Sequence, residues 1–153
     1  MALDPALQEL VEKAAIRELM TRYARSNDRR DFDSMTSTFT ADAYASYGDW
    51  ERQGVENIVG RLAYNRPHRA THFLGDQDIR IDGDSADVET YAIAYSRVEG
   101  TETLRMSGLR YQDKMVRQDG QWLVQHRVMH IDWRRNTPVD TSVPGIDRVP
   151  VSE

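Results

Sequence analysis

The chain has 153 residues, which predicts a single domain with a core of ordinary size. Cysteine is absent, which rules out disulfides, thiolate catalysis and Cys-ligated metal centres. The net charge is −5 and the two signs are interspersed, which argues against a nucleic-acid-binding protein. Because no apolar run approaches a membrane span and the first residues lack a signal-peptide pattern, we expect a cytoplasmic protein that binds no membrane.

The first half of the chain has the apolar periodicity of helices. Asp4 can cap a helix that begins with Pro5, and apolar residues recur at three- and four-residue steps as far as Tyr23. The pair Ser26-Asn27 is a suitable stop for this helix. We expect the remaining elements of this half to be a short helix over 32–39, a strand over 43–47, a turn over 48–54 and a third helix over 55–63.

The second half of the chain has the patterns of strands and tight turns. Asp-Gly sequences at 82–83 and 119–120 predict hairpins, and residues 86–98 alternate between two faces. Residues 136–153 are rich in proline and lack any period, so they form a tail or a pocket lid after a domain of residues 1–135. The predicted strands are 71–81 with an interruption around Gly75, 86–98, 102–117 and 121–133.

The order of these elements predicts an α+β architecture. Consecutive strands joined by short turns pair antiparallel, and helices gathered on one side of such a sheet make a two-layer fold. If the sheet is curved and three helices pack on its concave side, a blind pocket remains between the layers. Pockets of this kind commonly hold small apolar ligands.

Tyr23 and Asp28 are the first candidates for chemistry. If the first helix ends at Asn27, Asp28 enters a turn and can point inward beside Tyr23. In the alternative, Tyr23 is a core aromatic residue and Asp28 begins a solvated charged connector at 28–31. The sequence leaves both open.

His72 is the second candidate, because histidine most readily accepts and returns a proton near neutral pH. A carboxylate beside it would fix its tautomer, and Asp28 could serve if the fold brings the two together. A purely structural histidine is the alternative. His68 and His72 have the spacing of a helical metal pair, but the segment leads into a strand, so we expect no metal site.

Arg127 is the third candidate, because a buried arginine among apolar neighbours must find an anion or several acceptors. Both faces of the last strand are mixed, so alternation alone does not say which face is inward. The chain has no glycine-rich nucleotide loop and no Gly-x-Ser-x-Gly motif. An enzyme with this sequence would therefore work by acid–base chemistry without a cofactor.

Several short segments occur in an order and spacing that are typical of one fold family. They are Ala15-Ile16-Arg17-Glu18-Leu19, Tyr23, Asn27-Asp28-Arg29, Phe39-Thr40-Ala41-Asp42-Ala43, Thr71-His72, the run from Ile79 to Ala86, and Gly120-Gln121-Trp122. Together they resemble the SnoaL-like branch of the NTF2-like superfamily over residues 8 to 135. The resemblance implies a cone-shaped α+β barrel. It also implies relatives such as scytalone dehydratase, bile acid 7α-dehydratase and hexachlorocyclohexane dehydrochlorinase.

The resemblance also implies roles for the candidate residues. Asp28 and His72 stand where the dehydratases and the dehydrochlorinase have a catalytic Asp–His pair. Tyr23 stands where the bile acid dehydratase has a tyrosine, and Arg127 has the spacing from Trp122 of an arginine in the dehydrochlorinase. The further catalytic aspartate of the bile acid dehydratase is missing from the strand that includes residues 91–96.

The function expected from this resemblance is a cofactor-independent lyase. His72 would remove a proton from carbon, Asp28 would orient it, Tyr23 would bind the leaving group or a carbonyl oxygen, and Arg127 would stabilise negative charge. The substrate would be small and largely apolar, with cyclic or aromatic compounds as candidates.

The alternatives are an isomerase or polyketide cyclase with the same pair, a non-catalytic binding module, or an accessory subunit of an aromatic-ring dioxygenase. A homo-oligomer, dimer or trimer, is implied as well, with outward-facing strand residues such as Trp133 or Trp122 buried in its interface.

Overall fold

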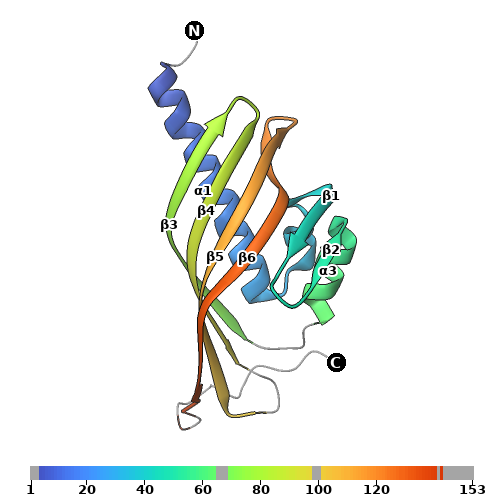
Figure 1. Cartoon of the computed structure of the whole chain (residues 1–153), viewed down its shortest axis with the longest axis vertical. Helices are drawn as coiled ribbons and strands as arrows, with labels where there is room; N and C mark the ends of the chain where they lie inside the picture. The colour runs from blue at the N-terminus through green and yellow to red at the C-terminus, as the bar shows by residue number, and fades with distance from the viewer. Residues whose placement is uncertain (1–3, 65–68, 98–100, 141, 143–153) are drawn as a thin grey trace.

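The computed structural model describes residues 4–64, 69–97, 101–140 and 142. Within these ranges, no helix combines the length and the apolar composition that a membrane span requires. Three helices and six strands occur along the chain (Figure 1). Their order is α1 Pro5–Arg29, α2 Phe32–Thr36, β1 Phe39–Ser46, β2 Glu51–Gln53, α3 Val55–Tyr64, β3 Ala70–Asp82, β4 Ser85–Arg97, β5 Thr103–Gln118 and β6 Gln121–Pro138.

The six strands form one curved, unclosed sheet in the order β2-β1-β6-β5-β4-β3. The four long strands from β3 to β6 pair antiparallel with their chain neighbours, as their short turns predict. The short β1 joins the sheet beside β6 in parallel, and β2 extends that edge. The α+β architecture predicted from the sequence is therefore confirmed.

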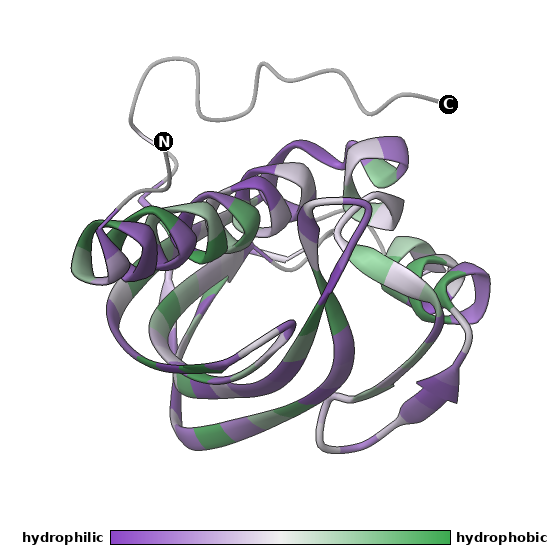
Figure 2. Ribbon diagram, turned by 90° about the horizontal axis from the view of Figure 1, so that it is seen from above, coloured by the Kyte–Doolittle hydropathy of each residue, from purple (hydrophilic) through white to green (hydrophobic). Residues whose placement is uncertain are grey.

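The helices cover the concave side of the sheet. Helix α1 lies against β3 and β6, α3 packs on β1, and α2 lies between the two helices (Figure 2). This arrangement explains the apolar face of α1, where Ile16, Leu19, Met20 and Tyr23 are fully buried. The core formed by this layer and the inner face of the sheet fills one end of the fold with apolar side chains.

Three predicted boundaries in the elements that follow α1 were wrong. The second helix ends at Thr36, and Phe39, expected at its end, begins β1. The predicted turn over 48–54 contains β2, which pairs back on β1. The last strand extends to Pro138, so the first residues of the predicted tail belong to the sheet, where they pair with β5. Most of the remaining tail lies outside the described residues, so its role as a lid stays a prediction.

A bulge in β6 decides where Arg127 points. The two-residue turn at 119–120 pairs Gln118 with Gln121, and a regular hairpin in that register would place Arg127 opposite Gln112. The structure instead inserts Gln125 as an extra residue and pairs Arg127 with Asp113. The inward face of β6 therefore changes from even to odd numbers at this point.

A second bulge in β6 reverses the change. Asp132 is the extra residue between the pairs Leu109–Ile131 and Gly108–Trp133. Beyond it, Arg134 lies opposite Ser107 and lines the inner side of the sheet, while Trp133 is half exposed. These two shifts are the reason that both faces of the strand look mixed in the sequence.

Candidate active site

Asp28 and His72 come together at the end of α1. We expected α1 to end at Asn27, but it continues to Arg29, so Asp28 lies in its last turn rather than in a loop. The left-handed Arg30 ends the helix, and its N–H bonds back to the carbonyl of Asn27. Strand β3 runs beside this turn and carries His72 near its start.

The contact between the two side chains is close and two-fold. The Nδ1 atom of His72 lies 2.5 Å from Oδ1 of Asp28, and the backbone N–H of His72 donates to Oδ2 at 3.0 Å. The carboxylate of Asp28 therefore forms hydrogen bonds with both the ring and the backbone of His72. With Nδ1–H directed at Asp28, Nε2 is the ring nitrogen that can exchange a proton with a ligand.

His72 faces a cavity of about 660 Å³ between the helices and the sheet. Its side chain is only 7% exposed, while that of Asp28, which stands behind it, is 21% exposed. The cavity wall combines apolar, aromatic and charged side chains. It includes Tyr23, Asn27, Tyr47, Asp49, Trp50, Leu62, Ala70, Leu109, Tyr111, Met129 and Ile131, together with polar residues near the far ends of β4, β5 and β6.

Tyr23 also lines this cavity, and its hydroxyl has a partner that we did not predict. The hydroxyl oxygens of Tyr23 and Tyr47 lie 2.8 Å apart. In such a couple one O–H is used between the two rings, and the other can donate to a ligand. The ring of Tyr47 stacks on Trp50, with centroids 4.6 Å apart, which fixes the second tyrosine in the wall.

Both hydroxyls of this couple stay protonated at neutral pH. Burial raises the pKa of Tyr23 above its ordinary value, and Tyr111 adds to this, although the charge of Arg127 opposes it. Burial likewise raises the pKa of Tyr47 well above its ordinary value. The couple is therefore a donor of hydrogen bonds rather than a source of phenolate.

Arg127 does not line the cavity, contrary to our expectation. Its side chain is completely buried, and its Nε and Nη2 donate to the two carboxylate oxygens of Asp113 at 2.7 and 2.8 Å. The guanidinium carbon lies 4.1 Å from the ring centre of Tyr23 and 4.5 Å from that of Tyr111. The arginine thus supports the tyrosine wall from behind by cation–π contacts instead of reaching a ligand.

Arg127 stays positively charged although it is buried. Burial alone would lower the pKa of the guanidinium, but the nearby charge of Asp113 holds that pKa well above its ordinary value. An arginine so held remains a cation at every physiological pH. A role in proton transfer is therefore excluded for it.

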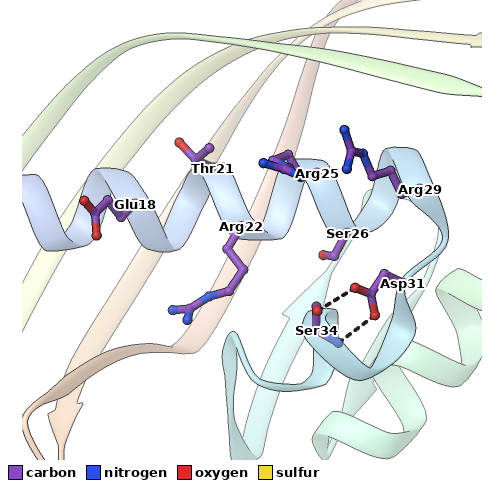
Figure 3. A pocket seen from close by; sticks show the side chains of 8 residues that line it. All are labelled: Glu18, Thr21, Arg22, Arg25, Ser26, Arg29, Asp31 and Ser34. Atoms are coloured by element: carbon purple, nitrogen blue, oxygen red, sulfur yellow. Dashed lines mark hydrogen bonds between the residues drawn. The ribbon is translucent and has the colours of Figure 1, made fainter.

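The structure contains a second hollow of about 370 Å³ on the outer side of α1 (Figure 3). Its wall consists of polar side chains, and the drawn hydrogen bonds join Asp31 to Ser34, where Asp31 caps α2. The predicted catalytic residues do not line this hollow. Among the described residues, no three His, Asp or Glu side chains gather in a way that could hold a metal ion. His68, which has the spacing of a helical metal pair with His72 but for which we expected no metal site, lies outside the described residues.

Two features now define the class of this protein: a curved sheet covered by N-terminal helices, and a cavity with a histidine oriented by a carboxylate. The first feature is the NTF2-like fold. The SnoaL-like domain family matches residues 8–128, and the chain belongs to this family.

Comparisons with individual proteins agree with this assignment. An uncharacterized protein of Mycobacterium tuberculosis strain H37Rv is 28% identical over 129 residues, which cover 80% of this chain and 87% of the relative. A scytalone dehydratase-like protein from Novosphingobium aromaticivorans is 23% identical with a TM-score of 0.79, covering 93% of this chain and 97% of the other. A type 2 hexachlorocyclohexane dehydrochlorinase (LinA) is 17% identical with a TM-score of 0.81, covering 92% and 99%. At these identities the two structures establish the shared fold.

Proposed function

We propose that this protein is a cofactor-independent lyase that removes a proton and a leaving group from a small, largely apolar substrate. The observation that carries the proposal is the Asp28–His72 contact, with His72 on the wall of a cavity that combines apolar, aromatic and charged side chains. Enzymes among the structural neighbours of this fold are consistent with it. Loss of water, loss of halide and retro-aldol cleavage all require the same arrangement of base and donor.

In the proposed reaction, His72 acts as the general base. Its Nε2 takes a proton from a carbon atom of the substrate, and the freed electron pair forms a double bond as the leaving group departs. Asp28 keeps the imidazole in the required tautomer and stabilises the imidazolium that forms. General base catalysis of this kind contributes about 10²–10⁴-fold to the rate.

The tyrosine couple serves the leaving group or a carbonyl oxygen. One O–H of Tyr23 and Tyr47 is used within the couple, and the other donates to the departing hydroxyl or halide, or to an oxygen that gains negative charge. A departing hydroxide accepts the proton that His72 took from carbon and leaves as water, whereas a departing halide leaves as the anion and His72 releases that proton to solvent. Both tyrosines keep their own protons throughout. Arg127 and Asp113 hold the rings of this couple in position from behind.

The test is turnover of a panel of small cyclic alcohols and halides, followed by mass spectrometry. A lyase releases water or hydrogen halide, so the product loses the corresponding mass, and His72→Ala lowers turnover by about 10²–10⁴-fold. His130→Ala is the matched control, because its Nε2 bonds to the exposed Gln112 and it does not line the cavity. A His72-dependent product of unchanged mass would favour an isomerase or cyclase. Ligand binding without any His72-dependent product would favour a binding module or an accessory subunit.

We also propose a homo-oligomer, formed through the convex face of the sheet. Phe73 lies opposite Ile93, and Ile93 opposite Gly108, which lies beneath the indole of Trp133. This row of partly exposed apolar side chains crosses four strands, and exposed apolar rows of this kind mark interaction surfaces. Trp122 does not belong to it, since that indole is buried and donates to Glu12. Sedimentation analysis tests the proposal, and Trp133→Glu is expected to yield monomers.

A further inference from the structure

The far end of the cavity carries more positive than negative charge. Of the described residues that line the cavity, three are arginines, Arg97, Arg105 and Arg134, and one is a carboxylate, Asp49. The protein as a whole has a net charge of −5. A positive wall inside an acidic protein favours ligands that carry negative charge.

The sheet register aligns this end with the catalytic histidine. His72 pairs with Ala94, Ala94 pairs with Ser107, and Ser107 pairs with Arg134. Residues directly opposite one another lie on the same face of a sheet, and all four line the cavity. Three strand spacings separate His72 from Arg134, which is about 14 Å along the sheet. A substrate of ordinary size can therefore contact both residues at once.

Two of these arginines, Arg105 and Arg134, are neighbours on the inner face of the sheet, where both line the cavity. Arg105 lies two residues before Ser107 on the same face of β5, which makes it the diagonal neighbour of Arg134, about 7–8 Å away. The Nε of Arg134 donates to the hydroxyl of Ser107 at 3.3 Å, which directs the side chain along the inner surface. Neither guanidinium contacts a carboxylate among the described residues.

Arg105 has an unsatisfied donor as well. Its Nε is buried and has no hydrogen-bond partner in the described part of the chain. A buried guanidinium N–H without an acceptor destabilises the unliganded fold, and an anionic acceptor would remove that cost. Arg127 also has a buried donor without a partner among the described residues, its Nη1, but this guanidinium is already neutralised by Asp113 and does not line the cavity, so no ligand reaches it there.

We propose that the substrate is an organic anion, whose carboxylate-type group binds Arg105 and Arg134 while its apolar body lies against Leu109, Met129 and Ile131 near His72. This inference deepens the proposed function and rests on it for the position of the reacting carbon. The guanidinium pair binds the anionic group in a bidentate or bridging manner. The distance between the two ends of the cavity then selects which carbon atom meets His72.

The test uses two fluorescent probes with the same aromatic body. The first, 8-anilinonaphthalene-1-sulfonate, carries an anionic group, and the second, N-phenyl-1-naphthylamine, does not. We expect the Kd of the anionic probe to be at least tenfold lower than that of the neutral probe, because hydrogen bonds to charged groups have about this effect. Added salt should weaken the anionic probe and leave the neutral probe unchanged.

Arg105→Gln and Arg134→Gln locate the effect. Each should raise the Kd of the anionic probe about tenfold and leave that of the neutral probe within twofold. Arg135→Gln is the matched control, because it removes the same charge from the next residue of β6, which does not line the cavity. Equal binding of the two probes by the natural chain, or an equal loss of binding in Arg135→Gln and Arg134→Gln, would overturn the inference. The probe comparison in the natural chain stands even if a variant does not fold.

The outcome is separable from that of the proposed function. An arginine-dependent preference for the anion without His72-dependent turnover would leave the anion site in place and refute the lyase. His72-dependent turnover without any anion preference would leave the lyase in place and refute the anion site. Where both hold, Arg134→Gln should raise KM of an anionic substrate much more than it lowers kcat.

Discussion

Two aspartates of this fold each hold a basic side chain, yet the two pairs differ in what they can do. Asp28 and His72 lie at the edge of the cavity, where the carboxylate is 21% exposed and the histidine lines the cavity wall. Asp113 and Arg127 are completely buried behind the tyrosine wall. Histidine can exchange a proton near neutral pH, whereas arginine cannot. If the proposed function holds, access to the cavity and the ability to exchange a proton, more than the proximity of opposite charges, distinguish the Asp28–His72 pair from the Asp113–Arg127 pair.

Asp28→Asn should separate the pairs most sharply, with a loss of activity of about 10²–10⁴-fold and little loss of stability. Asparagine can accept the backbone N–H of His72 with its carbonyl oxygen, which turns its NH₂ group toward Nδ1. Nδ1 must then accept, so Nε2 carries the proton and cannot act as a base. Turnover and urea unfolding of the same preparation measure the two effects.

Asp31→Asn is the control for this variant. It removes the same charge three residues further along the chain, and asparagine caps a helix as well as aspartate does. Full activity in Asp31→Asn is expected. If Asp28→Asn kept the activity of the unmodified chain, Asp28 would have no part in orienting the base.

The buried pair should respond in the opposite manner. Asp113→Ala leaves the guanidinium of Arg127 buried without its counter-charge, which costs about 3–5 kcal/mol of unfolding free energy. Replacing both residues, with Asp113→Leu and Arg127→Met, should recover most of this loss, because no charge then remains in the core. Urea denaturation measures the unfolding free energy of both variants, provided that its dependence on urea concentration has the same slope as in the natural chain.

A small effect in Asp113→Ala, below about 1 kcal/mol, would mean that water reaches the guanidinium and that the pair is not structural. The double variant keeps this prediction testable if the single variant does not fold. Its activity is informative too. Because Arg127 touches the rings of Tyr23 and Tyr111, turnover by a stable double variant reports how strongly the wall depends on the cation.

The contrast between the pairs also shows how far the sequence could go. The elements, the antiparallel order of the last four strands and the α+β class follow from periodicity and turn residues. The contact between Asp28 and His72 was predicted only from the resemblance to the SnoaL-like family, whose dehydratases have a catalytic Asp–His pair at these two positions. Local rules did not suffice for this pair, because its members are separated by 44 residues and meet only through packing of α1 on β3.

The role of Arg127 could not be predicted, for a physical reason that is visible in β6. A regular hairpin would have given Arg127 the neighbour Gln112, and only the extra residue Gln125 brings it to Asp113. No glycine or proline marks that bulge in the sequence. Tyr47 was missed for a similar reason, since a tyrosine at the end of a short strand gives no sign that it will meet Tyr23.

A smaller effect is expected at alkaline pH, where the buried tyrosines of the cavity wall should make the folded chain less stable. Burial raises the pKa values of Tyr23, Tyr47 and Tyr111, so the folded chain keeps three phenol protons that the unfolded chain releases above about pH 10. The unfolded state then binds fewer protons, and stability falls as pH rises. Each tyrosine contributes a slope of up to about 1.4 kcal/mol per pH unit.

Measurement of the unfolding free energy between pH 8 and pH 11 in the natural chain and in Tyr23→Phe tests this. The variant should lose about a third of the tyrosine-dependent slope, because one of three raised groups is gone. Identical slopes in the two chains would show that Tyr23 releases its proton as readily when folded as when unfolded. In that case it would not serve as a neutral donor above pH 10.

Tyr23→Phe also gives the smallest expected effect on activity, and it tests whether the tyrosine couple takes part in the reaction or only in the structure. Tyr23→Phe keeps the ring that Arg127 contacts and removes only the hydroxyl, so unfolding at pH 7 should change by no more than about 1 kcal/mol. The rate should fall about tenfold if this hydroxyl assists the leaving group. Tyr47→Phe removes the partner instead and leaves the Tyr23 O–H free to donate, so its rate should fall less. A larger loss in Tyr47→Phe would identify Tyr47 as the donor to substrate. Unchanged rates in both variants would mean that the two tyrosine hydroxyls have only a structural role, like the buried Asp113–Arg127 pair. Asp28 and His72 would then catalyse the reaction without their help.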